Sequence, residues 1–120
     1  MKIMILANEA PEDFALREDK EKSGAYLDAW RAYGASLRDA GVLLSGAALE
    51  APSAATVVSV RNGVRTDEYG PFPDTREQLG GFFVGECTDV EAAARWAATC
   101  PAARNGFVDV RVVPDYASGE

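Results

Sequence analysis

Two short stretches of the chain are apolar on both sides of the strand that each would form, rather than on one side only. In residues 3–7 both sets of alternating side chains are apolar, and residues 82–87 repeat this pattern. A strand that is apolar on both sides belongs in the middle of a sheet with both faces covered. We therefore expect residues 2–7 and 82–87 to form central strands.

Four further segments have strand character. Residues 56–60 are rich in β-branched side chains, and Asn62-Gly63, the strongest short hairpin signal, leads into a returning segment at residues 64–67. Residues 42–49 form a short strand that Gly46 weakens, and residues 107–113 alternate valines with Asp109 and Arg111. We expect a hairpin inserted among the strands of a larger sheet.

Helical periodicity is present in two places. Between residues 20 and 40 the apolar side chains recur at helical spacing and include the aromatic stripe Tyr26, Trp30 and Tyr33, and Gly41 stands where a C-cap glycine would. Residues 88–100 open on Thr88 and Glu91, which predict a capping box. The charged residues 9–22 predict a solvated loop leading into the first helix, with Phe14 and Leu16 as anchors.

The resulting order, β-α-β-β-(loop)-β-α-β, predicts an α+β fold. It is the pattern of a ferredoxin-like split βαβ antiparallel sheet with two helices on one face, plus an extra hairpin. At 120 residues we expect one domain over residues 1–116 and a frayed tail at 117–120. Because the helices cover one face only, the two-sided strands need a second cover, and we expect a homodimer to supply it.

Composition excludes several kinds of function. The net charge is −7 and the chain contains no histidine. The acidity argues against binding to nucleic acid or to an anionic membrane. Without histidine, Ser-His-Asp and Cys-His catalysis and histidine-bound zinc are unavailable, so any acid or base must be Asp, Glu, Lys, Tyr or a water that they position. We expect no cofactor and no metal.

The remaining composition predicts a cytoplasmic protein. Cys87 and Cys100 have no CxxC spacing and read as buried thiols in a reducing compartment. The apolar start of the chain is too short for a signal peptide, and no stretch reaches the roughly 18 apolar residues of a membrane-spanning helix.

Residues 67–83 carry the candidate chemistry. Prolines on both sides of Phe72 stiffen an aromatic loop, and Gly80-Gly81 leave room for a ligand or another segment to approach the backbone. One interpretation is a site in which a carboxylate with a raised pKa acts as base, Tyr69 donates a proton and Arg76 holds an anionic group. The predicted catalytic residues are Asp67, Glu68 and Tyr69, and the predicted substrate-binding residues are Phe72, Arg76, Glu77, Trp30 and Tyr33.

The same residues also have a structural interpretation. Arg76 would then pair with a carboxylate to fix the loop, while Tyr69 and Phe72 would fill the sheet end or the contact between two copies. Trp30 and Tyr33 would be packed in the core. A divalent cation on Asp67, Glu68, Asp74 and Glu77 would need more converging oxygens than their spacing can show.

Several motifs resemble the YCII-related, DGPF-domain family. They are residues 42–49, residues 69–72 with 77–82, and residues 91–97 with 100–103. The likeness covers nearly the whole chain, and the signature GPF-x-x-(T)-(K/R)-E-Q-L-GG-(F/Y) is fairly specific. The resemblance implies a dimeric α/β barrel, in which two ferredoxin-like units pack sheet to sheet with a cleft near the signature loop of each.

The resemblance implies less about function. Some relatives look like enzymes built on a His and Asp pair, which this chain lacks, and Tyr69 replaces the Asp that precedes Gly-Pro-Phe. We expect a small organic molecule, including an anionic one, to bind near residues 67–83, with carboxylate acid–base chemistry. The alternative is a non-catalytic regulatory or interaction module, for example one associated with sigma-factor regulation.

Overall fold

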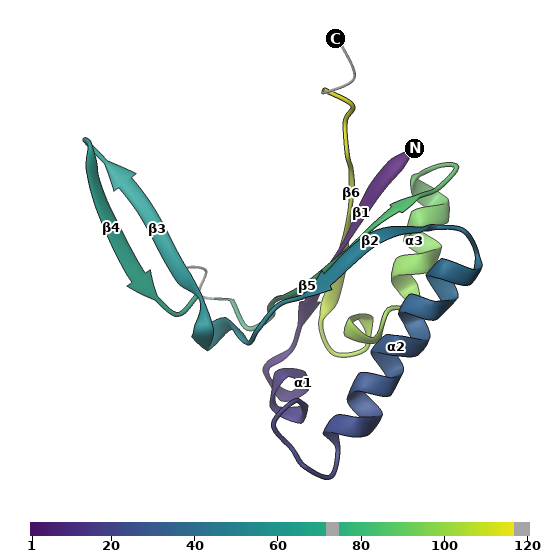
Figure 1. Ribbon diagram of the computed structural model, residues 1–120, viewed down its shortest axis with the longest axis horizontal. Helices are drawn as coiled ribbons and strands as arrows, with labels where there is room; N and C mark the ends of the chain where they lie inside the picture. Colours follow the sequence, from purple (N-terminus) through teal and green to yellow (C-terminus); the bar gives the residue numbers. More distant parts are fainter. Residues whose placement is uncertain (72–74, 117–120) are drawn as a thin grey trace.

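The computed structural model describes residues 1–71 and 75–116 and contains a four-stranded antiparallel sheet. Its strands, in the spatial order β2-β5-β1-β6, are β2 (Leu43–Ala48), β5 (Gln78–Glu86), β1 (Lys2–Glu9) and β6 (Phe107–Val112). The helices are α1 (Pro11–Leu16), α2 (Ser23–Asp39) and α3 (Val90–Ala98), with short 3-10 turns η1 (Pro52–Ala54) and η2 (Pro101–Ala103). Helices α2 and α3 lie on the same face of the sheet (Figure 1). The predicted ferredoxin-like α+β fold is confirmed.

The two-sided apolar strands β1 and β5 occupy the middle of the sheet, as predicted. On the helix side, Ile3 and Ile5 are almost completely buried. On the other side, Met4 pairs with Val84 and Leu6 pairs with Phe82. These residues are only half-buried. We call the face that carries Met4, Leu6, Phe82 and Val84 the open face; no helix of the described residues lies over it (Figure 1).

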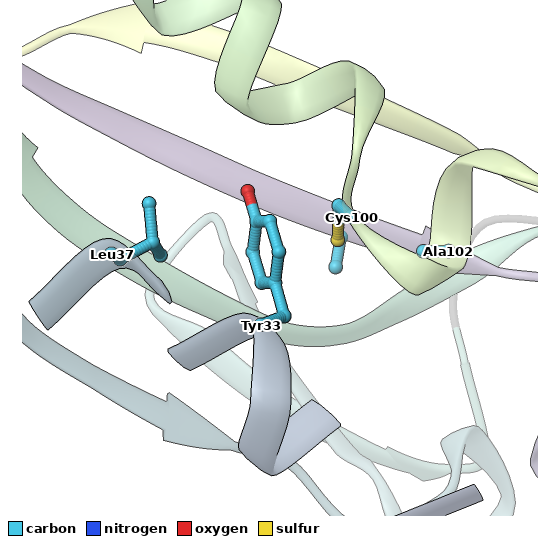
Figure 2. Packing of buried hydrophobic residues seen from close by; sticks show 5 residues of the cluster. Tyr33, Leu37, Cys100 and Ala102 are labelled. Carbon is cyan, nitrogen blue, oxygen red and sulfur yellow. The ribbon is translucent and has the colours of Figure 1, made fainter. Parts of the chain in front are cut away.

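The core lies between the sheet and the two helices. Tyr33 and Leu37 of α2 pack against Cys100 and Ala102, and the Tyr33 hydroxyl points towards α3 (Figure 2). There it donates a hydrogen bond to the Trp96 carbonyl oxygen at 2.8 Å. Cys100 is a free thiol whose pKa burial raises to about 11. The thiol is therefore uncharged and packs as a small apolar group.

The ends of the helices follow local sequence signals, with one correction. Gly41, at φ +75°, follows the end of α2 as predicted. The predicted capping box at Thr88 is wrong: the N-cap of α3 is Asp89, one residue later, and its carboxylate accepts a hydrogen bond from the Ala92 amide at 2.8 Å. Asp89 has the extended backbone that an N-cap needs, so Thr88 lies outside the helix.

A second correction concerns residues 9–22, which were predicted to be a solvated loop. Strand β1 continues to Glu9, and this residue is buried because it keeps the alternation of Ile3, Ile5 and Ala7. A short helix, α1, follows directly, and its Phe14 is a buried anchor as expected. The many charged residues of this segment suggested a loop in solvent, so neither the last residues of the strand nor the short helix was predicted from the sequence.

The predicted hairpin is formed by β3 (Thr56–Arg61) and β4 (Val64–Tyr69), joined at Asn62-Gly63. Both turn residues have positive φ, at 52° and 76°, as a two-residue hairpin turn requires. The hairpin, which we call the arm, extends away from the four-stranded sheet (Figure 1). The radius of gyration is 16.1 Å, whereas a compact chain of this length would have about 13.6 Å.

The N-cap of α3 gives a direct test of the corrected helix start. Asp89→Ala removes the carboxylate that accepts the Ala92 amide and should lower the free energy of unfolding by about 1 kcal/mol in urea titrations. Thr88→Ala, one residue earlier, should change it by less than about 0.5 kcal/mol. A larger loss for Thr88→Ala than for Asp89→Ala would restore the original capping box.

Candidate functional site

The end of strand β1 holds a buried carboxylate. Glu9 is only 1% exposed. Its Oε1 accepts a hydrogen bond from the Tyr26 hydroxyl, and its Oε2 accepts one from Arg17 Nη2 at 2.8 Å. Burying a carboxylate is costly unless it is paired and hydrogen-bonded. Both oxygens of Glu9 have a partner, so the charge is compensated in place.

Arg17 connects this carboxylate to four parts of the chain. Its Nε donates to the Tyr26 hydroxyl oxygen at 3.1 Å, and Nη2 also reaches the Gly80 carbonyl oxygen at 3.2 Å. Nη1 donates to the Leu49 carbonyl oxygen. The guanidinium carbon also lies 4.9 Å from the centre of the Phe14 ring. A planar, five-donor side chain suits such a junction, which a lysine would not reproduce.

Gly80 provides the space that the Glu9 carboxylate occupies. Ala7 pairs with Gly81 and Asn8 with Leu79, so Gly80 is the extra residue of a β-bulge. A methyl group on Gly80 would lie 1.8 Å from Glu9 Oε2. The sequence predicted a close approach of a ligand or another segment at Gly80-Gly81, and the approaching group is this carboxylate.

A cavity of about 400 Å³ lies between α2 and strands β2 and β5. Its polar lining comes from Glu9, Arg17 and Tyr26. Trp30 and Phe83 contribute aromatic rings, which stack with 6.4 Å between centroids and 16° between planes. The remaining lining residues are Leu27, Gly46, Ala47, Ala48, Gly80, Gly81 and Phe82. The small residues of β2 and β5 leave the space open beside the large rings.

The Tyr26 hydroxyl keeps its proton at neutral pH. Burial, and then the hydrogen bond to Glu9, raise the pKa of Tyr26 to about 12. The hydroxyl accepts from Arg17 Nε while it donates to Glu9. One end of the cavity thus has a carboxylate, a neutral hydroxyl and a guanidinium that are hydrogen-bonded to one another, with flat aromatic rings beside them.

The three predicted catalytic residues lie on the arm. Asp67, Glu68 and Tyr69 belong to β4 and are exposed, Tyr69 by 84%. Arg65 Nε and Nη2 each donate to Asp67 at 2.8 Å. None of the three lines the cavity described above. Their catalytic roles stay predictions.

Arg76 lies nearer to the body of the protein. Its Nη2 donates to the two Glu12 carboxylate oxygens at 2.5 and 2.7 Å, and Nη1 donates to Glu77 at 3.1 Å. The hydrogen bond from Arg76 is the main cause that lowers the pKa of Glu12. These contacts agree with the structural interpretation, in which Arg76 fixes the loop. Phe72 and Asp74 lie outside the described residues.

The aromatic stripe of α2 is divided between two environments. Tyr26 and Trp30 line the cavity, whereas the Tyr33 hydroxyl is engaged in the core. Sequence reasoning missed Glu9 and Arg17 as site residues and included Tyr26 only as part of the stripe. The sequence signal that could have identified Glu9 is the alternation of buried side chains in β1, which continues through Ile5 and Ala7 to Glu9.

Neither a metal site nor a membrane-spanning helix is found in the part of the chain that is described. Residues 1–71 and 75–116 contain no group of three or more His, Cys, Asp or Glu side chains placed to hold an ion. Within the same ranges, no helix combines the length and apolar character needed to cross a bilayer.

Comparisons with known proteins agree with this architecture. The profile of the YCII-related domain matches residues 1–116, so the chain belongs to the YCII-related domain family. A solved structure with the same fold is 5-chloro-2-hydroxyhydroquinone dehydrochlorinase (TftG) from Burkholderia phenoliruptrix, in complex with 2,5-dihydroxybenzoquinone. It is 15% identical with a TM-score of 0.51, and the match covers 95% of this chain and 94% of the other. This likeness establishes the fold alone. Curated proteins give no match.

The space at Gly80 gives a testable prediction. Gly80→Ala would drive a methyl group into Glu9 and should cost about 1–3 kcal/mol of unfolding free energy, as over-packing does. Gly24→Ala, in α2 with nothing within 4 Å of the added carbon, should leave stability unchanged or raise it by up to about 1 kcal/mol. Equal effects of the two substitutions in urea unfolding would contradict the close packing of Gly80 on Glu9.

Proposed function

We propose that this protein binds a small planar organic molecule with ring hydroxyl or quinone oxygens, in the cavity between α2 and β5. The observation that carries the proposal is the buried Glu9 carboxylate, which lines the cavity together with Tyr26. Glutamate side chains are rarely buried to this extent unless they are paired, as Glu9 is with Arg17 and Tyr26. A paired, buried carboxylate in an aromatic cavity is therefore a candidate for chemistry as well as for stability.

The dimensions and walls of the cavity define the class of ligand. Its volume of about 400 Å³ lies within the range of roughly 300–1,000 Å³ that is usual for small-molecule sites. The parallel rings of Trp30 and Phe83 favour a flat partner, because aromatic groups gain energy from offset stacking. The single-ring ligand named for the neighbouring dehydrochlorinase structure has a compatible shape.

The charges of the cavity favour neutral polar groups. Among the described lining residues Arg17 is the cation, and it is already paired with Glu9. A carboxylate or phosphate would have to compete with Glu9 for Arg17. A hydroxyl or carbonyl oxygen can instead exchange hydrogen bonds with Glu9, Tyr26 and Arg17 without disturbing the net charge.

The same three side chains support acid–base chemistry. A ring hydroxyl next to Glu9 would transfer its proton to a carboxylate oxygen, with Glu9 as general base. Once Glu9 is protonated, the Tyr26 hydroxyl would be released from it and, together with the Arg17 guanidinium, would stabilise the negative charge left on the ring oxygen. In this proton transfer the base and the groups that stabilise the negative charge are residues of this chain, and the step requires no cofactor.

Tyr26→Phe tests the proposed ligand site. It removes the hydroxyl that donates to Glu9 at the cavity wall and should weaken binding of dihydroxybenzoquinones or hydroquinones about ten-fold in calorimetric titration, the equivalent of about 1.4 kcal/mol. It should also lower stability, because Glu9 Oε1 loses its partner. Tyr33→Phe, a matched change on α2, removes the hydroxyl that donates to the Trp96 carbonyl. It should lower thermal stability and leave the affinity within about two-fold.

A parallel titration separates this cavity from the predicted site on the arm. Asp67→Asn and Arg76→Ala should leave the affinity unchanged. A loss of binding in either variant, with none in Tyr26→Phe, would move the site to residues 67–77. No binding across a broad panel of small molecules would favour the alternative of a regulatory or interaction module.

We also propose that the functional unit is a homodimer. The support is the open face, where Met4, Leu6, Phe82 and Val84 form an apolar centre over which no described helix lies. Exposed apolar surface of this kind marks an interface. Light scattering should give a mass of twice the 12.8 kDa of one chain. A mass of one chain at micromolar concentration would contradict the dimer.

A further inference from the structure

One side of the arm is apolar and exposed. Tyr69 pairs with Thr56, Asp67 with Val58 and Arg65 with Val60, so Val58, Val60 and Tyr69 share one side of the hairpin. They are 53%, 57% and 84% exposed. We call this side the arm's apolar face. The opposite side carries Ser59 paired with Thr66 at its centre, with Val57 and the 64% exposed Val64 on either side of that pair.

The charged pair on the arm's apolar face is neutralised within the arm. Arg65 Nε and Nη2 donate to the two Asp67 oxygens, both at 2.8 Å. A bidentate pair of this kind keeps its hydrogen bonds when water is removed, so it does not prevent burial of the face. Burial of the two valines and Tyr69 is favourable in free energy, because it removes their exposed apolar surface from water.

A two-stranded hairpin is marginally stable without further packing. The arm leaves the sheet between the adjacent strands β2 and β5 and rises on the side of the open face, opposite to α2 and α3 (Figure 1). A second copy seated on the open face would therefore lie beside the arm. The arm and the open face together form one continuous surface for the same occupant.

The area of the interface supports the same occupant. Four strands of about six residues, at roughly 4.8 Å between strands and 3.3 Å per residue, present only about 400 Å² in projection. A stable interface buries about 800 Å² of accessible surface on each partner. Side chains give a face more accessible area than its projection, and the two strands of the arm would raise the projected area by about half, to roughly 600 Å².

We propose that the arm clasps the second copy of the chain, with Val58, Val60 and Tyr69 against the partner. The inference rests on the homodimer proposed above. It favours the structural interpretation of Tyr69 as part of the contact between two copies, and it gives Asp67 a role in the same contact.

Two neighbouring substitutions on β3 test the face that makes the contact. Val60→Glu adds a net negative charge to the arm's apolar face, because Arg65, the residue opposite, is already paired with Asp67. Ser59→Glu adds the same charge on the other side, opposite Thr66. Sedimentation velocity over a range of concentrations would give the dimer Kd of each variant, with circular dichroism to verify folding.

The expected result is a Kd raised at least ten-fold in Val60→Glu and changed by less than three-fold in Ser59→Glu. Wild-type dimerisation in both variants, or equal weakening in both, would overturn the clasp while leaving the homodimer in place. A wild-type protein that stays a single chain would overturn the clasp and the homodimer together, and ligand titrations on that single chain would still test the cavity independently.

Discussion

The requirement to compensate one buried carboxylate organises the folded chain around the end of β1. Glu9 needs a donor for each oxygen, and it obtains them from Tyr26 on α2 and from Arg17 just beyond α1. It also needs space, which the bulge at Gly80 supplies. Removing one partner of a buried pair costs about 3–5 kcal/mol, because an uncompensated charge remains. The Glu9 side chain therefore fixes the end of β1, the end of α1, helix α2 and the bulge at Gly80 relative to one another.

The same arrangement connects stability to function. An apolar residue at position 9 would pack the end of the sheet without the need for Arg17 and Tyr26, and replacements of this type are often neutral or stabilising. A carboxylate here is instead placed beside a cavity with stacked aromatic walls. Its hydrogen bonds with Arg17 and Tyr26 hold it in one orientation, and the raised pKa of Tyr26 keeps that hydroxyl protonated next to it. The geometry is that of a preorganised site, which we interpret as a binding site for a flat, oxygenated ring.

The elements could be predicted from the sequence wherever local signals decide the structure. The two-sided pattern of residues 3–7, the Asn62-Gly63 turn and Gly41 each depend on a few neighbouring residues. The start of α3 was displaced by one residue because Thr88 and Asp89 are both good caps, and only the backbone conformation distinguishes them. The burial of Glu9 was missed because the charged residues that follow it suggested solvent.

The site was harder to predict because its residues are far apart in the sequence. Glu9, Arg17, Tyr26 and Gly80 meet only through the antiparallel pairing of β1 with β5 and the packing of α2. In contrast, the site at residues 67–77 was predicted because its carboxylates are close together in the sequence, and closeness in the sequence does not indicate whether a side chain is buried. Trp30 is the predicted binding residue that lines the cavity.

The most direct test of the account uses the two tryptophans as internal reporters. Trp30 lines the cavity, whereas Trp96 packs against the core between α3 and the sheet. In ¹⁵N NMR spectra of the indole N–H groups, titration with a dihydroxybenzoquinone should shift the Trp30 signal and leave the Trp96 signal in place. Saturable binding that leaves Trp30 unchanged would contradict the assignment of this cavity as the ligand site.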